Sequence, residues 1–443
     1  MAVDRTRVLV PIGEPIGGHM SAVGIRQFEV GRALAVHCDV TFASTAETND
    51  EAHGVRVVRC RTRGDFRGLL RQHDVVYTLG LNPDRYLDVV RSGIRVVFDI
   101  YTPIAFEILE AWPDVPTPLL SRMHRRAVRW TEAQLERADF IVCANERQRD
   151  LWLGVLNSIG RLTAERTRIR PDCRDLIDVC SFGISDIPPT GGGHPLRDCL
   201  PGVGEDDFLL VWSSKILSWQ DPCTLLLAMR ILLDEDPRVR LVFLGIGEIP
   251  TEDRRDPFSP SAARTREAVT LARSLGVMDR NVFFITDRVP YRDIGSYYRD
   301  ADAAVSTYPD SLETRFCLGS RILDYVWADL PMVVSGCELQ REFIEQQGLG
   351  FVVPPADPLA LAEAIKRIKA NSPSERCRAA FAAARERLNW RVVVRPILSY
   401  CISEHARVRQ TRRRTLCARV QLAEFLGRSA AIRVARRWHG VAH

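Results

Sequence analysis

The segment 306–335 constrains the fold of this chain more than any other. A polar loop leads to Gly319, and the run 321–328 that follows has its apolar residues at helical spacing. Pro331 marks the end of that helix, and 332–334 is an apolar run typical of a buried strand. A loop, a helix and a strand in this order predict one repeat of an α/β fold.

The start of the predicted helix is a candidate anion site. Ser320 suits the N-cap position, where the next backbone N–H groups lack partners and the helix dipole favours negative charge. Arg321 adds a cation, and the carboxylates of Glu313 and Asp324 could accept hydrogen bonds from hydroxyl groups. We therefore hypothesise that a diphosphate binds here. The alternative is an ordinary αβ unit that begins with Gly-Ser and carries a solvated arginine.

Two motifs in this segment resemble the donor-sugar signature of retaining glycosyltransferases of family 4. Residues 313–316 read Glu-Thr-Arg-Phe and residues 323–331 read Leu-Asp-Tyr-Val-Trp-Ala-Asp-Leu-Pro, as in one bacterial branch of that family. The broad family has two acidic residues eight positions apart. This chain has Asp324 at the second position but Phe316 at the first, so Glu313 would reach the sugar from a shifted loop.

The resemblance implies the GT-B architecture, in which two Rossmann-like, doubly wound parallel-sheet domains face each other across a cleft. A length of 443 residues also favours two domains. The predicted parts are an acceptor-side domain (1–190), a linker (191–205), a nucleotide-sugar-binding domain (206–385), a terminal helix that returns to the first domain (386–406) and a basic C-terminal extension (407–443).

Short apolar runs predict the strands of both domains. They lie at 7–11, 40–43, 55–58, 74–77, 96–99 and 140–143 in the first half, and at 208–212, 241–245, 282–285, 303–306 and 332–334 in the second. The segment 177–183 is interpreted as the approach to the linker, and 248–261 as a mobile polar loop.

The candidate residues of the first domain follow its predicted strands. Gly17 and Gly18 come after the first strand and resemble the paired glycines that approach the donor phosphates in the family, although tight turns also need glycine. The acceptor side is assigned to His19, Arg26, Asp99 and Thr102. The alternatives are a structural histidine and an aspartate that caps a turn.

The second domain contributes most of the predicted donor site. Only three of the 61 basic residues are lysine, and Lys215 follows a strand directly in a loop of small residues. By resemblance, Lys215 and Gln220 occupy the positions of an Arg and a Lys, in that order, that neutralise the diphosphate, although Gln220 lacks the charge. The remaining donor contacts are assigned to Ser214, Gly245, Arg288, Val289, Arg315, Gly319, Ser320 and Asp324. A solvent-facing lysine is the alternative for Lys215.

No metal or other cofactor is expected. Asp300-Ala301-Asp302 is similar to the metal-binding motif of the other large glycosyltransferase fold, but it lies between a predicted helix and a predicted strand. The family resemblance also implies a reaction without a metal.

Partners and location are predicted from composition. The chain has twelve cysteines, no CxxC pair and no evident signal peptide or membrane span, which favours a reduced cytoplasmic protein. Ten arginines lie in 401–443, so this tail is a candidate for weak contact with the inner face of a membrane. It contains no base-reading motif, and nucleic acid is not an expected partner.

The predicted function is transfer of a sugar from a nucleoside diphosphate to a small-molecule or glycan acceptor, with retention of the anomeric configuration. Lys215, Arg321 and Glu313 are the predicted catalytic residues. Bacterial polysaccharide or natural-product biosynthesis is the predicted context. Two alternatives stay open: an inactive nucleotide-sugar-binding or scaffold protein, and an epimerase or phosphorylase on the same fold.

Overall fold

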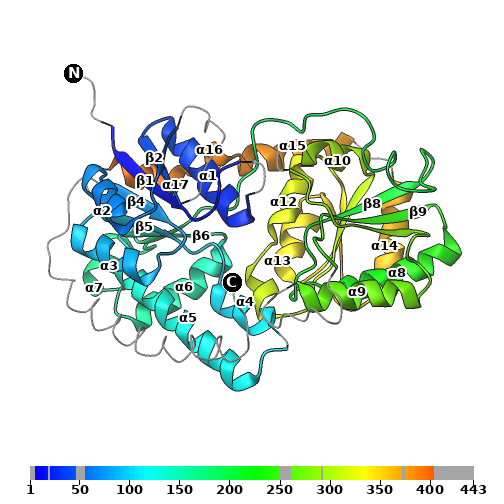
Figure 1. The fold of residues 1–443 in the computed structure, drawn as a ribbon, viewed down its shortest axis with the longest axis horizontal. Coiled ribbons are helices and arrows are strands. Elements are labelled where there is room, and N and C mark those ends of the chain that lie inside the picture. Colours follow the sequence, from blue (N-terminus) through cyan, green and yellow to red (C-terminus); the bar gives the residue numbers. More distant parts are fainter. Residues whose placement is uncertain are drawn as a thin grey trace. The chain divides into compact units, whose positions relative to one another are not determined.

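The computed structural model of the protein describes residues 5–17, 20–45, 55–112, 114–249, 259, 261–290, 293–371 and 375–403. The chain divides into two compact units (Figure 1). Unit 1 contains residues up to Thr102, Arg122–Ser181 and the chain from Val393. Unit 2 contains Pro103–Ser121 and Phe182–Val392.

Unit 1 is built on a seven-stranded parallel sheet with the order β3-β2-β1-β4-β5-β6-β7. Its strands are β1 (Arg7–Ile12), β2 (Asp39–Ser44), β3 (Arg56–Arg59), β4 (Val75–Thr78), β5 (Arg95–Asp99), β6 (Phe140–Cys143) and β7 (Ile177–Val179). Its helices are α1 (Ala22–Ala35), α2 (Arg63–Gln72), α3 (Pro83–Ser92), most of α5 (Thr117–Arg137), α6 (Glu146–Ser158), α7 (Ala164–Ile169) and α17 (Arg395–Ile402). The central strands are buried along almost their whole length, which explains why they read as continuous apolar runs.

Unit 2 is built on a six-stranded parallel sheet with the order β10-β9-β8-β11-β12-β13. Its strands are β8 (Phe208–Ser213), β9 (Val239–Leu244), β10 (Val282–Ile285), β11 (Ala303–Ser306), β12 (Met332–Ser335) and β13 (Gly350–Val353). Its helices are α4 (Ile104–Ala111), α8 (Pro222–Glu235), α9 (Ala262–Ser274), α10 (Ile294–Asp300), α11 (Leu312–Phe316), α12 (Ser320–Trp327), α13 (Glu338–Gln340) with the π-helical turn η1 (Arg341–Glu345), α14 (Pro358–Ala370), α15 (Glu375–Leu388) and α16 (Trp390–Val393).

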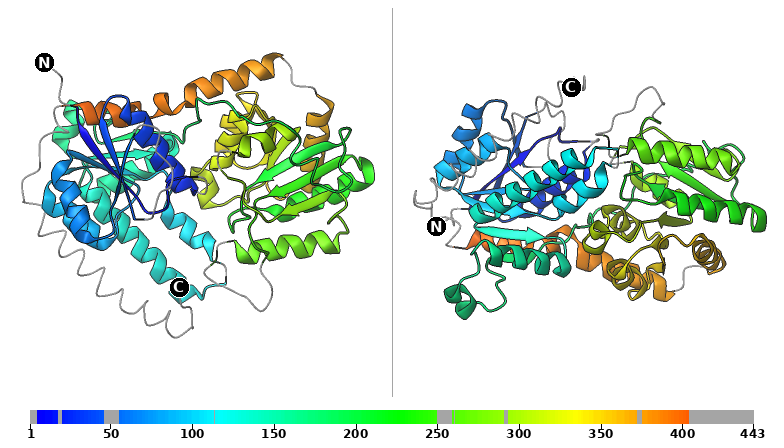
Figure 2. Two further views of the ribbon diagram at one scale, coloured as in Figure 1. Left: turned by 45° about the horizontal axis from the view of Figure 1, so that its top comes forward. Right: turned by 90° about the horizontal axis from the view of Figure 1, so that it is seen from below.

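The sheet of unit 2 separates two hydrophobic cores. Along β8, Leu210 and Trp212 join the core formed with α8, α9 and α14, whereas Leu209 and Val211 join the core formed with α10, α12 and α15. Alternate side chains of a strand point to opposite faces, so helices cover both faces of this sheet (Figure 2). This is the doubly wound arrangement that the sequence predicted.

The predicted strands are confirmed to within a few residues, but three local predictions are wrong. The segment 177–183 contains the edge strand β7, which pairs with β6. The loop that carries Glu313 contains the short helix α11, which Ser311 caps. Gly319 is the N-cap of α12, and Ser320 is its first helical residue.

The division of the chain also differs from the predicted boundaries. Unit 1 ends at Ser181, and the predicted linker packs onto unit 2 through the buried side chains of Leu196 and Leu200. Residues 103–121, which the prediction gave to the first domain, cluster with unit 2. The chain re-enters unit 1 at Val393, where Tyr400 of α17 stacks on Phe140 of β6.

Among the described residues, no helix has both the length and the apolar character needed to cross a membrane. The basic extension predicted at 407–443 and most of the polar loop predicted at 248–261 lie outside the described residues.

Candidate functional site

The candidate donor site lies at the carboxyl ends of β8, β9 and β11 in unit 2. These strands are neighbours in one parallel sheet, so the loops that follow them emerge at the same edge. The loop after β8 carries Ser214 and Lys215, the loop after β9 carries Gly245, and β11 leads to α11 and the start of α12. The fold therefore brings together segments that are up to about a hundred residues apart in the sequence.

Two buried tyrosines fix the start of α12 against the end of β8. The Tyr298 hydroxyl donates to Ser213 Oγ at 2.8 Å and lies 3.5 Å from Asp324 Oδ2. The Ser213 backbone N–H donates to the Tyr325 hydroxyl at 3.1 Å. Burial raises the pKa of both phenols, so they act as neutral hydrogen-bonding groups. The sequence pattern does not reveal the role of these tyrosines, because Tyr residues on helices at apolar spacing are typical of an ordinary core.

The turn before α12 requires glycine at position 319. Gly319 has φ +71°, and a Cβ built there would lie 2.5 Å from the hydroxyl of buried Tyr308. Both the backbone conformation and the close approach therefore exclude a side chain. No side chain caps this helix start, so its first backbone N–H groups are not screened by a capping hydroxyl.

Arg321 and Asp324 form an ion pair on the first turns of α12. Arg321 Nη1 lies 2.8 Å from Asp324 Oδ2, and both side chains are partly exposed. Burial lowers the pKa of Arg321, but Asp324 outweighs that effect, and the net shift is upward. The guanidinium is therefore charged at any physiological pH, and an incoming anion would compete with Asp324 for it.

Lys215 is an exposed cation at the edge of the loop after β9. Its Cε lies 3.7 Å from the position that a Cβ on Gly247 would take, and Gly245 and Gly247 both have positive φ. Within the described part of the chain, the Lys215 side chain makes no hydrogen bond or ion pair, although its backbone carbonyl accepts from the Ser214 hydroxyl at 3.0 Å. Its charge is therefore available to a ligand.

Some predicted donor contacts make hydrogen bonds or ion pairs within the protein. Gln220 is buried, and its Oε1 accepts from the Leu217 backbone N–H at 2.8 Å, so it shapes the loop before α8 and does not face solvent. Arg315 forms an exposed ion pair with Asp310. Of the other predicted donor contacts, Arg288 is exposed and Val289 packs partly on the core.

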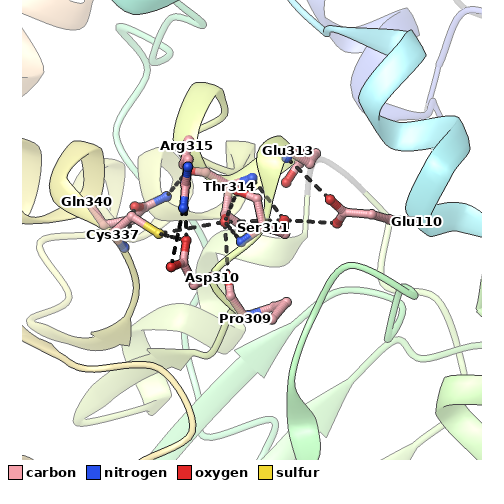
Figure 3. Close-up of polar contacts among 9 residues, drawn as sticks. All are labelled: Glu110, Pro309, Asp310, Ser311, Glu313, Thr314, Arg315, Cys337 and Gln340. Carbon is pink, nitrogen blue, oxygen red and sulfur yellow. Dashed lines mark hydrogen bonds and ion pairs between the residues drawn. The ribbon is translucent and has the colours of Figure 1, made fainter.

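Glu313 is the most buried of the predicted catalytic residues, with 6% of its surface exposed. Two carboxylates of α4, Glu107 and Glu110, lie close enough to repel it (Figure 3 shows Glu110). Burial raises the pKa of Glu313 to about 8, and these charges add to the effect. Burial raises the pKa of Glu107 to about 7, with a contribution from Glu110. Glu313 is therefore largely protonated at neutral pH.

We expect the stability of unit 2 to fall as the pH rises from about 5 to about 8. Above pH 4.5 the unfolded state releases the protons of Glu107 and Glu313, whereas the folded state keeps them up to pH 7–8. The contribution of the two groups to the free energy of unfolding is therefore largest at low pH and is lost as the pH rises through 7–8. The change should be several kcal/mol, because the two pKa values lie about 2.5 and 3.5 units above 4.5 and one pKa unit is about 1.4 kcal/mol. Urea unfolding of wild type and Glu313→Gln at pH 5, 7 and 9 measures it. If the free energies of unfolding of the two proteins depended on pH in the same way, this expectation would be contradicted.

Two of the predicted acceptor-side residues are buried in unit 1. Arg26 donates to Asp99 through Nε at 2.7 Å and Nη2 at 3.1 Å, and neither side chain is exposed. Arg26 also donates to the backbone carbonyls of Cys180 and Ser181, and Tyr77 donates to Asp99 at 2.5 Å. In this structure Arg26 and Asp99 are enclosed in unit 1 and pair with each other, which favours a structural role, and their assignment to the acceptor side stays a prediction.

The other candidates of the first domain are only partly placed. Gly17 is half-buried in the loop after β1 and has φ +141°, whereas Gly18 and His19 lie outside the described residues. Thr102 is half-buried and is the last residue of its segment in unit 1.

The two aspartates of the Asp300-Ala301-Asp302 motif make structural contacts within unit 2. Asp300 accepts from the backbone N–H groups of Leu196 and Arg197, and Asp302 pairs with the Arg197 side chain at 2.8 Å. Among the residues that the structure describes, no group of three or more His, Cys, Asp or Glu side chains is arranged to hold a metal.

Comparison with known proteins agrees with this architecture. Residues 201–387 match the family model described as glycosyl transferases group 1. EpsD of Bacillus subtilis (strain 168) is 26% identical over 167 residues, and the match spans 38% of this chain and 38% of EpsD.

Solved structures resemble the chain over most of its length. A glycosyltransferase from Rickettsia africae has 13% identity and a TM-score of 0.58, over 90% of this chain and 98% of its own. Anabaena HepE in complex with UDP-glucose has 15% identity and a TM-score of 0.60, over 89% of this chain and 98% of its own. The fold of this chain is therefore GT-B, and its second unit carries the match to the glycosyl transferases of group 1.

Proposed function

We propose that this protein transfers a sugar from a nucleoside diphosphate to a small-molecule or glycan acceptor, with retention of the anomeric configuration. The observation that carries the proposal is the unpaired Lys215 beside the glycine loop after β9, at the same sheet edge as the uncapped start of α12. A cation and free backbone N–H groups at one edge suit a diphosphate. UDP-glucose bound to HepE, on the same fold, supports this ligand class.

The proposed chemistry is electrostatic. Negative charge grows on the diphosphate as the bond to the sugar breaks, and Lys215, Arg321 and the α12 N–H groups would stabilise it. Asp324, on the same helix turn as Arg321, would accept hydrogen bonds from ribose or sugar hydroxyls. Because Glu313 keeps its proton at neutral pH, it would donate a hydrogen bond to a sugar oxygen. We assign no separate base, and we propose that no metal takes part.

A protein that binds nucleotide sugars without turnover is the second candidate. It is favoured by two observations: Gln220 is buried where a second cation would be needed, and Arg321 is already paired with Asp324. The two functions share the ligand and differ only in turnover.

Nucleotide binding is the first experiment. UDP, GDP, ADP and TDP should be titrated into wild type and into Lys215→Ala and Arg321→Ala. We expect one nucleotide to bind, with a loss of about 1 kcal/mol or more in each variant, which is the scale of a charge-assisted hydrogen bond. The absence of binding to all four would exclude the proposed function. Binding without turnover across an acceptor panel would favour the second candidate, and turnover that requires an acceptor would exclude an epimerase.

A further inference from the structure

Helix α4 belongs to unit 2, although it follows directly after β5 of unit 1 in the sequence. Its side chains reach residues about two hundred positions away. Glu110 Oε2 accepts from the Ser311 hydroxyl at 2.9 Å, and Glu110 Oε1 accepts from the Glu313 backbone N–H at 3.3 Å (Figure 3). The ring of Phe106 stacks on Phe316, with centroids 5.5 Å apart.

Glu110 completes the N-terminal cap of α11. The Ser311 hydroxyl has one proton, which it gives to Glu110, so that its oxygen lone pairs can accept from the Thr314 backbone N–H at 3.3 Å. The second Glu110 oxygen takes the Glu313 N–H, which a helix cannot satisfy in its own first turn. One carboxylate therefore orients the capping hydroxyl and satisfies a second N–H group.

The other end of α11 is held in a similar way. Gln340 donates through Nε2 to the backbone carbonyls of Thr314 and Cys317, at 3.1 and 3.0 Å. A helix of five residues has little stability of its own, so these outside contacts fix where it lies. The orientation of the Glu313 side chain depends on them.

Helix α4 also contacts the loop that carries Lys215. The Ser218 hydroxyl donates to the backbone carbonyl of Ala111, the last residue of α4, at 2.7 Å, and both groups are buried. The same helix thus touches α11 through Phe106 and Glu110 and the loop after β8 through Ala111. These are two of the segments that form the candidate donor site.

We propose that Glu110 is a positioning residue for the sugar part of the donor, because it fixes α11 and with it the carboxyl group of Glu313. The inference rests on the proposed function. It assigns Glu110 no contact with the ligand: the residue acts through Ser311 and the Glu313 backbone. Loss of Glu110 should therefore affect the sugar and leave the nucleotide contacts of Lys215 and Arg321 intact.

The test compares matched ligand pairs: UDP with UDP-glucose, and the corresponding ADP, GDP and TDP pairs. For the pair that wild type binds, Glu110→Ala should weaken binding of the nucleotide sugar about tenfold, which corresponds to about one lost hydrogen bond between Glu313 and the sugar. Binding of the free nucleotide should change less than twofold. Glu110→Gln keeps one acceptor oxygen, so it should recover part of the loss.

Glu363→Ala is the matched control, because Glu363 is an exposed helix-borne glutamate of α14, which packs on α8 and β12. If Glu110→Ala lost affinity equally for the nucleotide and the nucleotide sugar, the inference would be overturned, since equal losses indicate general damage to unit 2. Unchanged binding of both would also overturn it while leaving the proposed function standing. If Glu110→Ala does not fold, Glu110→Gln is tested in its place, with the same comparison of nucleotide and nucleotide-sugar binding. If wild type binds none of the ligands, the proposed function and the inference both fail.

Discussion

Lys215→Ala is expected to lower kcat/KM for sugar transfer by about 100- to 1,000-fold. This is the range for loss of one group that stabilises charge in a transition state. The effect should be large here because Lys215 is the one cation of its loop, residues 214–220, and it has no partner among the described residues that could compensate. Steady-state kinetics with the donor found by the binding experiment measures it.

The chain provides its own control for this substitution. Lys366 lies on α14 and pairs with Glu235 and Glu363 on the surface, so Lys366→Ala removes a lysine without touching the candidate site. We expect its kcat/KM to match wild type. Lys215→Arg keeps the charge but changes its geometry, so its kcat/KM should lie between those of wild type and Lys215→Ala. A Lys215→Ala enzyme with wild-type kcat/KM would remove this residue from the mechanism.

Arg26→Ala is expected to destabilise unit 1 by about 3–5 kcal/mol. Removal of one partner of a buried ion pair leaves the other charge buried and uncompensated. Here the variant would leave the Asp99 carboxylate beside Tyr77 in a fully buried position and would free two backbone carbonyls, those of Cys180 and Ser181. Urea unfolding followed by circular dichroism should show an earlier transition for unit 1.

A surface arginine of the same unit serves for comparison. Arg166 pairs with Asp175, and both side chains are about one-third exposed, so Arg166→Ala should cost less than about 1 kcal/mol. An Arg26→Ala protein with unchanged unfolding but a raised KM for the acceptor would contradict the structural role and support the acceptor-side assignment made from the sequence.

Two residues near the site make hydrogen bonds that local sequence patterns do not predict. Ser311 reads as a loop residue because its capping box involves only four residues and α11 is shorter than two helical turns. Gln220 reads as a ligand contact because its position after Lys215 matches a family pattern, yet the loop turns its amide inward to Leu217. Neither outcome follows from residue type, since both depend on which way a short segment packs.

The sequence by itself determined the two parallel sheets, the positions of most of their strands and the placement of Lys215 and Gly319 at strand and helix ends. These features are local: apolar runs of four to six residues, glycines and helix caps act within one element or one turn. The tertiary structure alone decided that Arg26 and Asp99, 73 residues apart, neutralise each other in the interior. It also decided that Glu110 caps a helix 201 residues away. Charged side chains of this kind have no periodic signature, and their roles follow from the packing that surrounds them.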